Sequence, residues 1–104
     1  MSELAAGEGQ VQELIRFRVD AGAEPALLAG RAAAVAALRE RFGLLDSRLA
    51  RTGEEGVWID TMLFPSAAAA DRALAEEMEL EAFASWVANV AELVSSERVD
   101  LVCP

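Results

Sequence analysis

The sequence lacks several residue types on which enzyme chemistry often depends. It has no histidine, no tyrosine and a single cysteine, and all 9 of its basic residues are arginine. Without histidine there is no Ser-His-Asp triad, no Cys-His dyad and no His-ligated zinc or haem iron. One cysteine permits no intrachain disulfide and no Cys-rich metal site. Without lysine, Schiff-base chemistry and a Walker-type phosphate lysine are also excluded.

The charge balance and hydrophobic content limit the possible partners. The chain has 104 residues, 54% of them hydrophobic, and a formal net charge of −9. Its acidity argues against a nucleic-acid surface, and its apolar content excludes an intrinsically disordered chain. The longest apolar runs, Ala26–Ala29 and Ala32–Leu38, are too short to span a bilayer. Residues 1–10 resemble a flexible tail and not a signal peptide, so we expect a cytoplasmic single domain over residues 11–104.

Hydrophobic periodicity predicts the first half of this domain. Val11–Val19 alternates with period two, which is typical of a strand with one apolar face. Helical spacing runs from Glu24 to Phe42, with a proline in the first turn and Gly43 directly after the last. Leu44–Arg51 and Val57–Phe64 alternate again. The short glycine-containing turn between these two runs predicts a β-hairpin.

The second half contains a helix whose apolar stripe changes phase. Ser66 is a suitable N-cap for an alanine-rich helix that follows it. The stripe slips after Met78, within the acidic stretch Glu76–Glu81, so we expect a kink or two helices there. The glutamates of this stretch point in different directions on a helix, which predicts a solvated face. Ser95-Ser96 breaks the pattern, and Glu97–Val102 is predicted to form the last strand.

The order strand, helix, strand, strand, helix, strand predicts an α+β fold. It is the βαββαβ arrangement of a ferredoxin-like sandwich, with a four-stranded antiparallel sheet and both helices on one face. The other face is predicted to carry a mixed set of apolar and charged side chains: Leu14, Arg16, Arg18, Trp58, Asp60, Met62 and Phe64, near Asp46 and Arg48. This set is too apolar to stay bare on a small monomer. We therefore expect a two-fold homodimer whose sheets face each other, with Arg16 or Arg18 paired to Asp60.

Two segments carry a resemblance to a known family. Residues 57–67 read VWIDTMLFPSA, and residues 78–86 read MELEAFASW. Both resemble the antibiotic biosynthesis monooxygenase family of dimeric α/β barrels, whose order of elements matches residues 11–102. The resemblance implies a pocket between the sheet and the helices of each subunit. It also implies oxygenation of aromatic polyketides without metal, flavin or other cofactor, with Trp, Asn and Arg side chains orienting the substrate. A haem-degrading branch uses a histidine iron ligand, which this chain lacks.

The candidate catalytic residues are Trp86, Asn89 and Arg16. Trp86 and Asn89 are three residues apart and share one helix face. In the catalytic interpretation, Trp86 walls the pocket and Asn89 donates to a substrate oxygen; in the alternative, Trp86 is core and Asn89 is a capping or solvated group. Arg16 or Arg18 would bind a carboxylate or phenolate through its planar fork of donors. The alternative places both arginines in interface ion pairs with acids such as Asp60.

The candidate substrate-binding residues are the aromatic, sulfur and acidic side chains near the predicted pocket: Phe17, Trp58, Asp60, Phe64, Met78 and Phe83. Asp60 would act as a general base if burial raised its pKa, and would otherwise be a salt-bridged acid. Met78 would contact a ligand through the kink or simply fill a gap. Cys103 has no neighbouring base or positive charge, so no catalytic role is assigned to it.

Two hypotheses of function follow. In the first, the chain is a small dimeric barrel protein that binds a hydrophobic or aromatic small molecule and acts as a cofactor-independent monooxygenase. In the alternative, it is a non-catalytic dimeric module that binds a ligand or serves through its dimer surface. A pocket with an aromatic wall and at least two convergent polar groups favours the first hypothesis, whereas a pocket walled only by Ala, Leu and Val favours the second.

Overall fold

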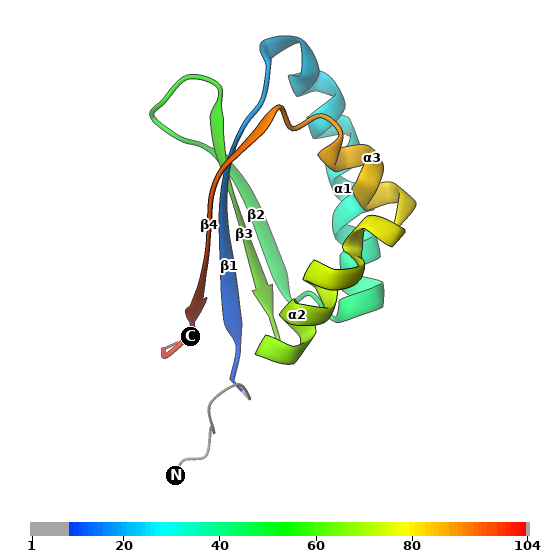
Figure 1. The fold of residues 1–104 in the computed structure, drawn as a ribbon, viewed down its shortest axis with the longest axis vertical. Coiled ribbons are helices and arrows are strands. Elements are labelled where there is room, and N and C mark those ends of the chain that lie inside the picture. The colour runs from blue at the N-terminus through cyan, green and yellow to red at the C-terminus, as the bar shows by residue number, and fades with distance from the viewer. Residues whose placement is uncertain (1–8, 104) are drawn as a thin grey trace.

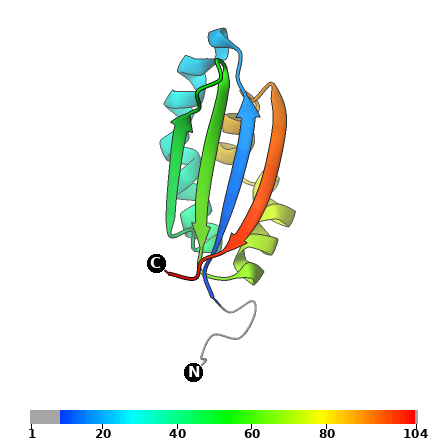
Figure 2. The same ribbon diagram turned by 90° about the vertical axis from the view of Figure 1, so that its left-hand side faces the viewer.

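Four strands form one antiparallel sheet in the order β2-β3-β1-β4, and the helices lie on one of its faces (Figures 1 and 2). The computed structural model describes residues 9–103, so most of the tail expected over residues 1–10 lies outside the described residues. In chain order the elements are β1 (Val11–Arg18), η1 (Ala21–Ala23), α1 (Glu24–Phe42), β2 (Asp46–Arg51), β3 (Val57–Phe64), α2 (Ala67–Glu76), η2 (Glu77–Glu79), α3 (Glu81–Val87) and β4 (Glu92–Asp100). This is the predicted ferredoxin-like α+β sandwich. None of the helices in the described part of the chain could cross a membrane.

The helix ends follow their local sequence signals. Pro25 lies in the first turn of α1, and Gly43 closes the helix with a φ of 73°, a left-handed conformation that suits glycine. Ser66 caps α2, because its side chain accepts a hydrogen bond from the Ala69 amide at 3.1 Å. The predicted helix boundaries at these residues are therefore confirmed.

The second helical region is broken where the apolar stripe slips. α2 ends at Glu76, the short 3-10 turn η2 follows, and Leu80 takes up an extended conformation with φ −86° and ψ 116° before α3 begins. The predicted break within Glu76–Glu81 is confirmed. The chain thus covers this part of the sheet with two short helices at an angle, as Figure 1 shows.

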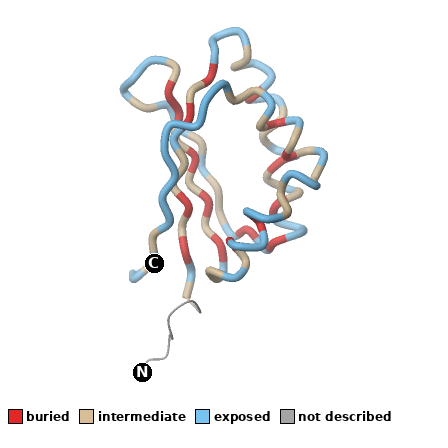
Figure 3. The backbone as a smooth tube through the Cα atoms, in the orientation of Figure 1, coloured by how far each residue is buried: buried red, intermediate tan, exposed pale blue. Residues whose placement is uncertain are grey.

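The last strand differs from its prediction. β4 begins at Glu92 and runs through Ser95-Ser96, which was expected to be a break. Opposite β1, Ser95 pairs with Arg16 and Leu93 pairs with Phe17, so Val94 is the extra residue of a β-bulge. Because β4 is an edge strand exposed on nearly its whole length (Figure 3), it lacks the apolar alternation that identifies a half-buried strand.

The expected orientation of β3 is wrong. Phe17 of β1 pairs with Trp58 and Ile15 pairs with Asp60, and directly opposed residues point to the same face of a sheet. The β3 side chains predicted for the outer face therefore lie under the helices, and all of them are buried: Trp58, Asp60, Met62 and Phe64. β3 is apolar on both faces, so alternation by itself did not define which face is covered.

The buried residues of the hydrophobic core lie on the facing sides of the sheet and the helices (Figure 3). α1 contributes Leu27, Ala34, Leu38 and Phe42, with Val35 packed beside them. The apolar residues at helical spacing in this segment are Leu28, Ala32, Val35, Leu38 and Phe42. Val35, Leu38 and Phe42 pack toward the sheet as this spacing predicts, but Leu28, at 51% exposure, and Ala32 do not, because Leu27 is the buried residue of the first turns.

Candidate functional site

A cavity of about 270 Å³ lies between the sheet and the broken second helical region. Its walls come from the helix-facing side of β1, β3 and β4 and from α2, η2 and α3. Most lining residues are apolar: Ile15, Phe17, Met62, Leu74, Met78, Phe83, Trp86, Val87, Val90 and Leu93. The polar lining residues are Asp60, Glu77 and Ser96. The cavity is therefore an apolar chamber with a few polar groups, as small-molecule sites usually are.

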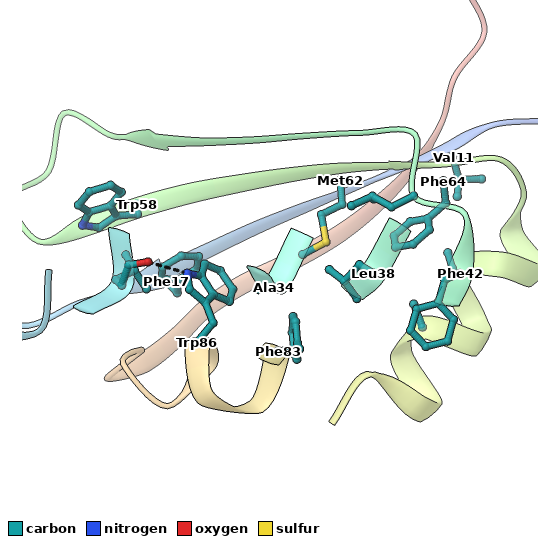
Figure 4. Close-up of a cluster of buried hydrophobic side chains, with 14 of the residues drawn as sticks. Val11, Phe17, Ala34, Leu38, Phe42, Trp58, Met62, Phe64, Phe83 and Trp86 are labelled. Carbon is teal, nitrogen blue, oxygen red and sulfur yellow. Dashed lines mark hydrogen bonds between the residues drawn. The ribbon is translucent and has the colours of Figure 1, made fainter. Parts of the chain in front are cut away.

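Trp86 forms the aromatic wall of this cavity. Its ring meets Phe17 edge-on, with centroids 6.0 Å apart, and packs against Phe83 at 5.9 Å. The indole Nε1 donates a hydrogen bond of 2.9 Å to the Leu27 carbonyl of α1, drawn as a dashed line in Figure 4. The three rings and this bond hold the indole in one orientation, so the wall is rigid before any ligand enters.

Arg31 and Asp60 form a buried ion pair beside Trp86. Asp60 is 1% exposed, and its two carboxylate oxygens accept hydrogen bonds of 2.7 and 2.8 Å from the guanidinium of Arg31. The same guanidinium also donates to the Ser47 hydroxyl and lies 4.9 Å from the Trp86 ring centroid. Burial raises the pKa of Asp60 above its ordinary value, while the Arg31 bonds act in the opposite direction. Both oxygens are occupied, so Asp60 is a structural anchor for α1 on β3.

Glu77 is the other carboxyl at the cavity. Burial, together with the negative charges of Glu13 and Asp60, raises the pKa of Glu77 to about 7. Glu13 itself is buried on β1, but its carboxylate accepts a 2.5 Å hydrogen bond from Arg98, which also donates to Asp71 at 2.8 Å. Within residues 9–103, Glu77 has no such partner. It is therefore a carboxyl that gains and loses its proton close to neutral pH, next to an apolar chamber.

The structure brings five of the nine predicted site residues to the cavity and leaves four elsewhere. The five that line it are Phe17, Asp60, Met78, Phe83 and Trp86. Arg16 is exposed on the opposite face of the sheet, so it cannot pair with Asp60 as expected. Trp58 is buried beneath Arg51, whose guanidinium lies 4.5 Å from its ring centroid, and Phe64 belongs to the core.

The structure also places Arg18 and Asn89 away from the cavity. Arg18 does not contact Asp60 either; it pairs with Glu54 at 3.2 Å and Glu92 at 3.4 Å. Asn89 does not line the cavity: its amide nitrogen donates to the carbonyls of Ser85 and Trp86 at the end of α3. This local bond is the capping alternative considered for Asn89.

Two residues of the site were missed by sequence reasoning. Arg31 is not among the predicted site residues, although its side chain reaches the sheet and binds Asp60. Glu77 was expected on a solvated acidic face, and that expectation is wrong because Glu77 lines the cavity. The signal for Glu77 was the break itself, since a residue at a broken helix does not follow the helical wheel. Arg31 carried no local signal, because its partner is 29 positions away in the chain.

Sequence comparisons identify no relative. No protein-family model matches the chain, and no curated protein matches it. Solved structures are nevertheless similar in fold. A protein of Caulobacter crescentus, assigned as a candidate antibiotic biosynthesis monooxygenase, has a TM-score of 0.71 at 20% identity and covers 93% of each chain. A protein of Bordetella bronchiseptica with the same assignment has a TM-score of 0.71 at 20% identity, covering 91% of this chain and 99% of its own.

A third similar structure has a stated activity. It is a mutant form of SnoaB, a cofactor-independent oxygenase from Streptomyces nogalater, with a TM-score of 0.63 at 19% identity over 90% of this chain and 92% of that one. This chain has the fold of antibiotic biosynthesis monooxygenase-like proteins. The resemblance seen in residues 57–67 and 78–86 is thus confirmed at the level of the fold.

Proposed function

We propose that this protein binds an aromatic small molecule in the cavity and oxygenates it without a cofactor. The observation that carries the proposal is the aromatic cavity wall of Phe17, Phe83 and Trp86, with Asp60 and Glu77 also among the lining residues. An engineered apolar cavity of about 150 Å³ holds one benzene molecule. A chamber of about 270 Å³ with an open mouth thus suits a ligand of roughly two to three fused rings.

The mouth of the cavity supports an apolar ligand. Leu74, Met78 and Leu93 line it and are all more than half exposed. Exposed large apolar side chains gathered at one opening are uncommon on a small protein unless they contact a partner or ligand. An apolar molecule entering here would bury these side chains and gain stabilisation from the water they release.

The proposed reaction is the oxygenation of an electron-rich ring, for which anthrone serves as the test substrate. Anthrone and O₂ give anthraquinone and water: the ring methylene becomes a carbonyl, one oxygen atom stays on carbon, and the other leaves as water. All electrons come from the substrate, so no metal, flavin or external reductant enters the balance. The similarity in fold to a cofactor-independent oxygenase supports this reaction class.

We also propose that two copies pair through the outer faces of their sheets. The helices cover only one face (Figure 2), and the other carries partly exposed apolar side chains, among them Leu14, Ile59, Leu63 and Val99. Leu14 was expected on this face, and Ile59, Leu63 and Val99 take the place of the β3 residues that were expected there, so the physical argument is the same. Light scattering should give twice the mass of the chain, and Ile59→Lys should shift the protein toward monomer. A wild-type monomer at high concentration would exclude this pairing.

The two tryptophans provide a matched test of the site. Both are buried, but only Trp86 lines the cavity. We expect Trp86→Phe to reduce O₂ consumption with anthrone about tenfold, because it removes aromatic area and the bond to Leu27, a combined loss of about 1 to 2 kcal/mol. Trp58→Phe and Asn89→Ala should leave turnover per folded molecule unchanged. If the wild type binds anthrone but consumes no O₂, the proposed oxygenation is wrong and the function is ligand binding.

A further inference from the structure

Two carboxyls, those of Asp60 and Glu77, line the cavity, and Glu13 of β1 lies close enough to Glu77 to raise its pKa. Asp60 gives both oxygens to Arg31, and Glu13 is held by Arg98. Glu77 lines the chamber, and in residues 9–103 its carboxyl meets no arginine and no hydrogen-bond donor. Its charge is therefore balanced by no partner in the described part of the protein.

The negative charges near Glu77 disfavour a permanent negative charge on its carboxyl. Among the charged groups on the surrounding elements, Glu13 of β1 and Asp60 of β3 act on the Glu77 carboxyl. The others include Arg31 of α1, Asp71, Arg72 and Glu76 of α2, Glu79 of η2, Glu81 of α3 and Arg98 of β4. Arg31 and Arg98 are already committed to other carboxylates, and Glu76 and Glu79 both pair with Arg41. Taking up a proton at Glu77 relieves repulsion from Glu13 and Asp60.

We propose that Glu77 is the proton acceptor of this site, removing an acidic hydrogen from the bound aromatic ligand. The inference rests on the proposed function. In the step, an acidic C–H or O–H bond of the ligand breaks, its electron pair stays on the ring system, and the proton forms an O–H bond with a Glu77 oxygen. The negative charge moves from the carboxylate to the ligand, and no oxidant takes part. The resulting ring anion is the electron-rich species that reacts with O₂ in the proposed oxygenation.

This role specifies the chemical class of ligand. A neutral aromatic molecule with a hydrogen of moderate acidity, such as an anthrone or a phenol, meets Glu77 as a proton donor. An aromatic carboxylate would instead bring a third negative charge beside Glu77 and Asp60, with no uncommitted arginine among the cavity-lining residues to receive it. The site should therefore prefer anthrone-like molecules to aromatic acids of the same size.

The pH dependence follows from the charge state of Glu77. Its raised pKa of about 7 means that it is a proton acceptor above that pH and already protonated below it. A base whose pKa lies near the working pH is substantially deprotonated and still binds a proton strongly, which is the condition for efficient general base catalysis. Formation of the ligand anion should thus rise with pH around neutrality.

The test uses two probes of similar shape under anaerobic conditions: anthrone, which has an acidic methylene, and anthraquinone, which has none. We expect wild-type protein to bind both and to form the anthrone anion, seen by its visible absorbance, with a midpoint near pH 7. Glu77→Gln should bind anthraquinone as tightly as wild type but form at least about tenfold less anion at pH 8. Glu81→Gln, an exposed glutamate in the adjacent helix, is the matched control and should behave as wild type.

The outcomes separate this inference from the proposed function. Equal anion formation by Glu77→Gln and wild type would overturn the role of Glu77 and leave ligand binding intact. Absence of binding of both probes by the wild type would overturn the proposed function together with it. Carbon NMR of the carboxyls in the ligand-free protein adds an independent check: a signal titrating near pH 7 should be missing in Glu77→Gln. Titration of Glu77 near its ordinary value of 4.5 would also contradict the inference.

Discussion

The two helical coverings of the sheet are built differently. α1 is unbroken over 19 residues and lies behind β2 and β3, whereas α2, η2 and α3 cover β1 and leave the edge strand β4 largely exposed (Figure 2). Under α1 the side chains are packed tightly, with Leu27 and Leu38 almost fully buried. Under the broken layer there is a cavity.

This difference shows how the fold combines stability with a binding site. A continuous helix presents a side chain to the sheet at every turn and fills the space below it. The turn at η2 and the extended residue Leu80 interrupt that series, so the space at β1 stays open and Glu77 and Met78 border it. The Arg31–Asp60 pair holds α1 on β3, and the bond from Trp86 to the Leu27 carbonyl joins α3 to α1.

The largest expected effect comes from breaking the Arg31–Asp60 pair. Asp60→Asn should destabilise the protein by about 3 to 5 kcal/mol, because it leaves the guanidinium of Arg31 buried without its counter-charge. Urea unfolding at pH 7 measures this change. The control is Asp46→Asn, which breaks the exposed pair with Arg48 and should cost less than about 1 kcal/mol. Equal losses in the two variants would contradict the role assigned to Asp60.

The next effect compares the two coverings directly. Replacing Leu38, which is 2% exposed under α1, with alanine should lower the free energy of unfolding by about 2 to 4 kcal/mol, since it leaves a cavity in a packed core. Leu74 is 63% exposed at the cavity mouth. Leu74→Ala should lower the free energy of unfolding by no more than about 0.5 kcal/mol, but it should weaken anthraquinone binding. Urea unfolding and fluorescence titration distinguish the two effects. A loss at Leu74 as large as that at Leu38 would mean that the broken layer is packed as tightly as α1.

The smallest effect concerns Glu77 and depends on pH. Because its pKa is about 7 in the folded protein and 4.5 ordinarily, the folded state keeps a proton that the unfolded state loses between these values. The contribution of the protonated Glu77 to the stability of the folded state is complete below pH 4.5 and is lost as the pH rises to about 7. Glu77→Gln should therefore be more stable than wild type at pH 8, by about 1 to 2 kcal/mol after allowance for solvent screening, and equal to it near pH 4.

Urea curves at both pH values measure this difference, with Glu81→Gln as the control for removing an exposed charge. A Glu77→Gln variant less stable than wild type at pH 8 would mean that Glu77 makes a favourable contact as an anion. That result would also weaken its assignment as the proton acceptor.

Much of the fold was predictable because its signals are local. Pro25, Gly43 and Ser66 act through the backbone of their own turn, so the boundaries of α1 and the start of α2 were predicted correctly. The break at Glu76–Glu81 was predicted from the phase of the apolar stripe. The site was predicted only in part, since Phe17, Phe83 and Trp86 are aromatic residues on elements whose inner face was correctly assigned.

The remaining errors share one cause. β3 is apolar on both faces, so its orientation depended on pairing with β1, and the error moved Trp58, Asp60 and Phe64 to the wrong side. β4 has little apolar alternation because it is an exposed edge, so its start was missed. Each of these features is decided by a contact with a distant segment.

The sequence by itself determined the order of the elements, their ends and the break in the second helical region, because each depends on residues within a turn or two of one another. It also excluded histidine chemistry of every kind. Only the tertiary structure decided which face of β3 is covered, that Arg31 is bound to Asp60, and that Glu77 borders the cavity. These depend on sheet register and on the packing of helices against it, which bring together groups that are far apart in the chain.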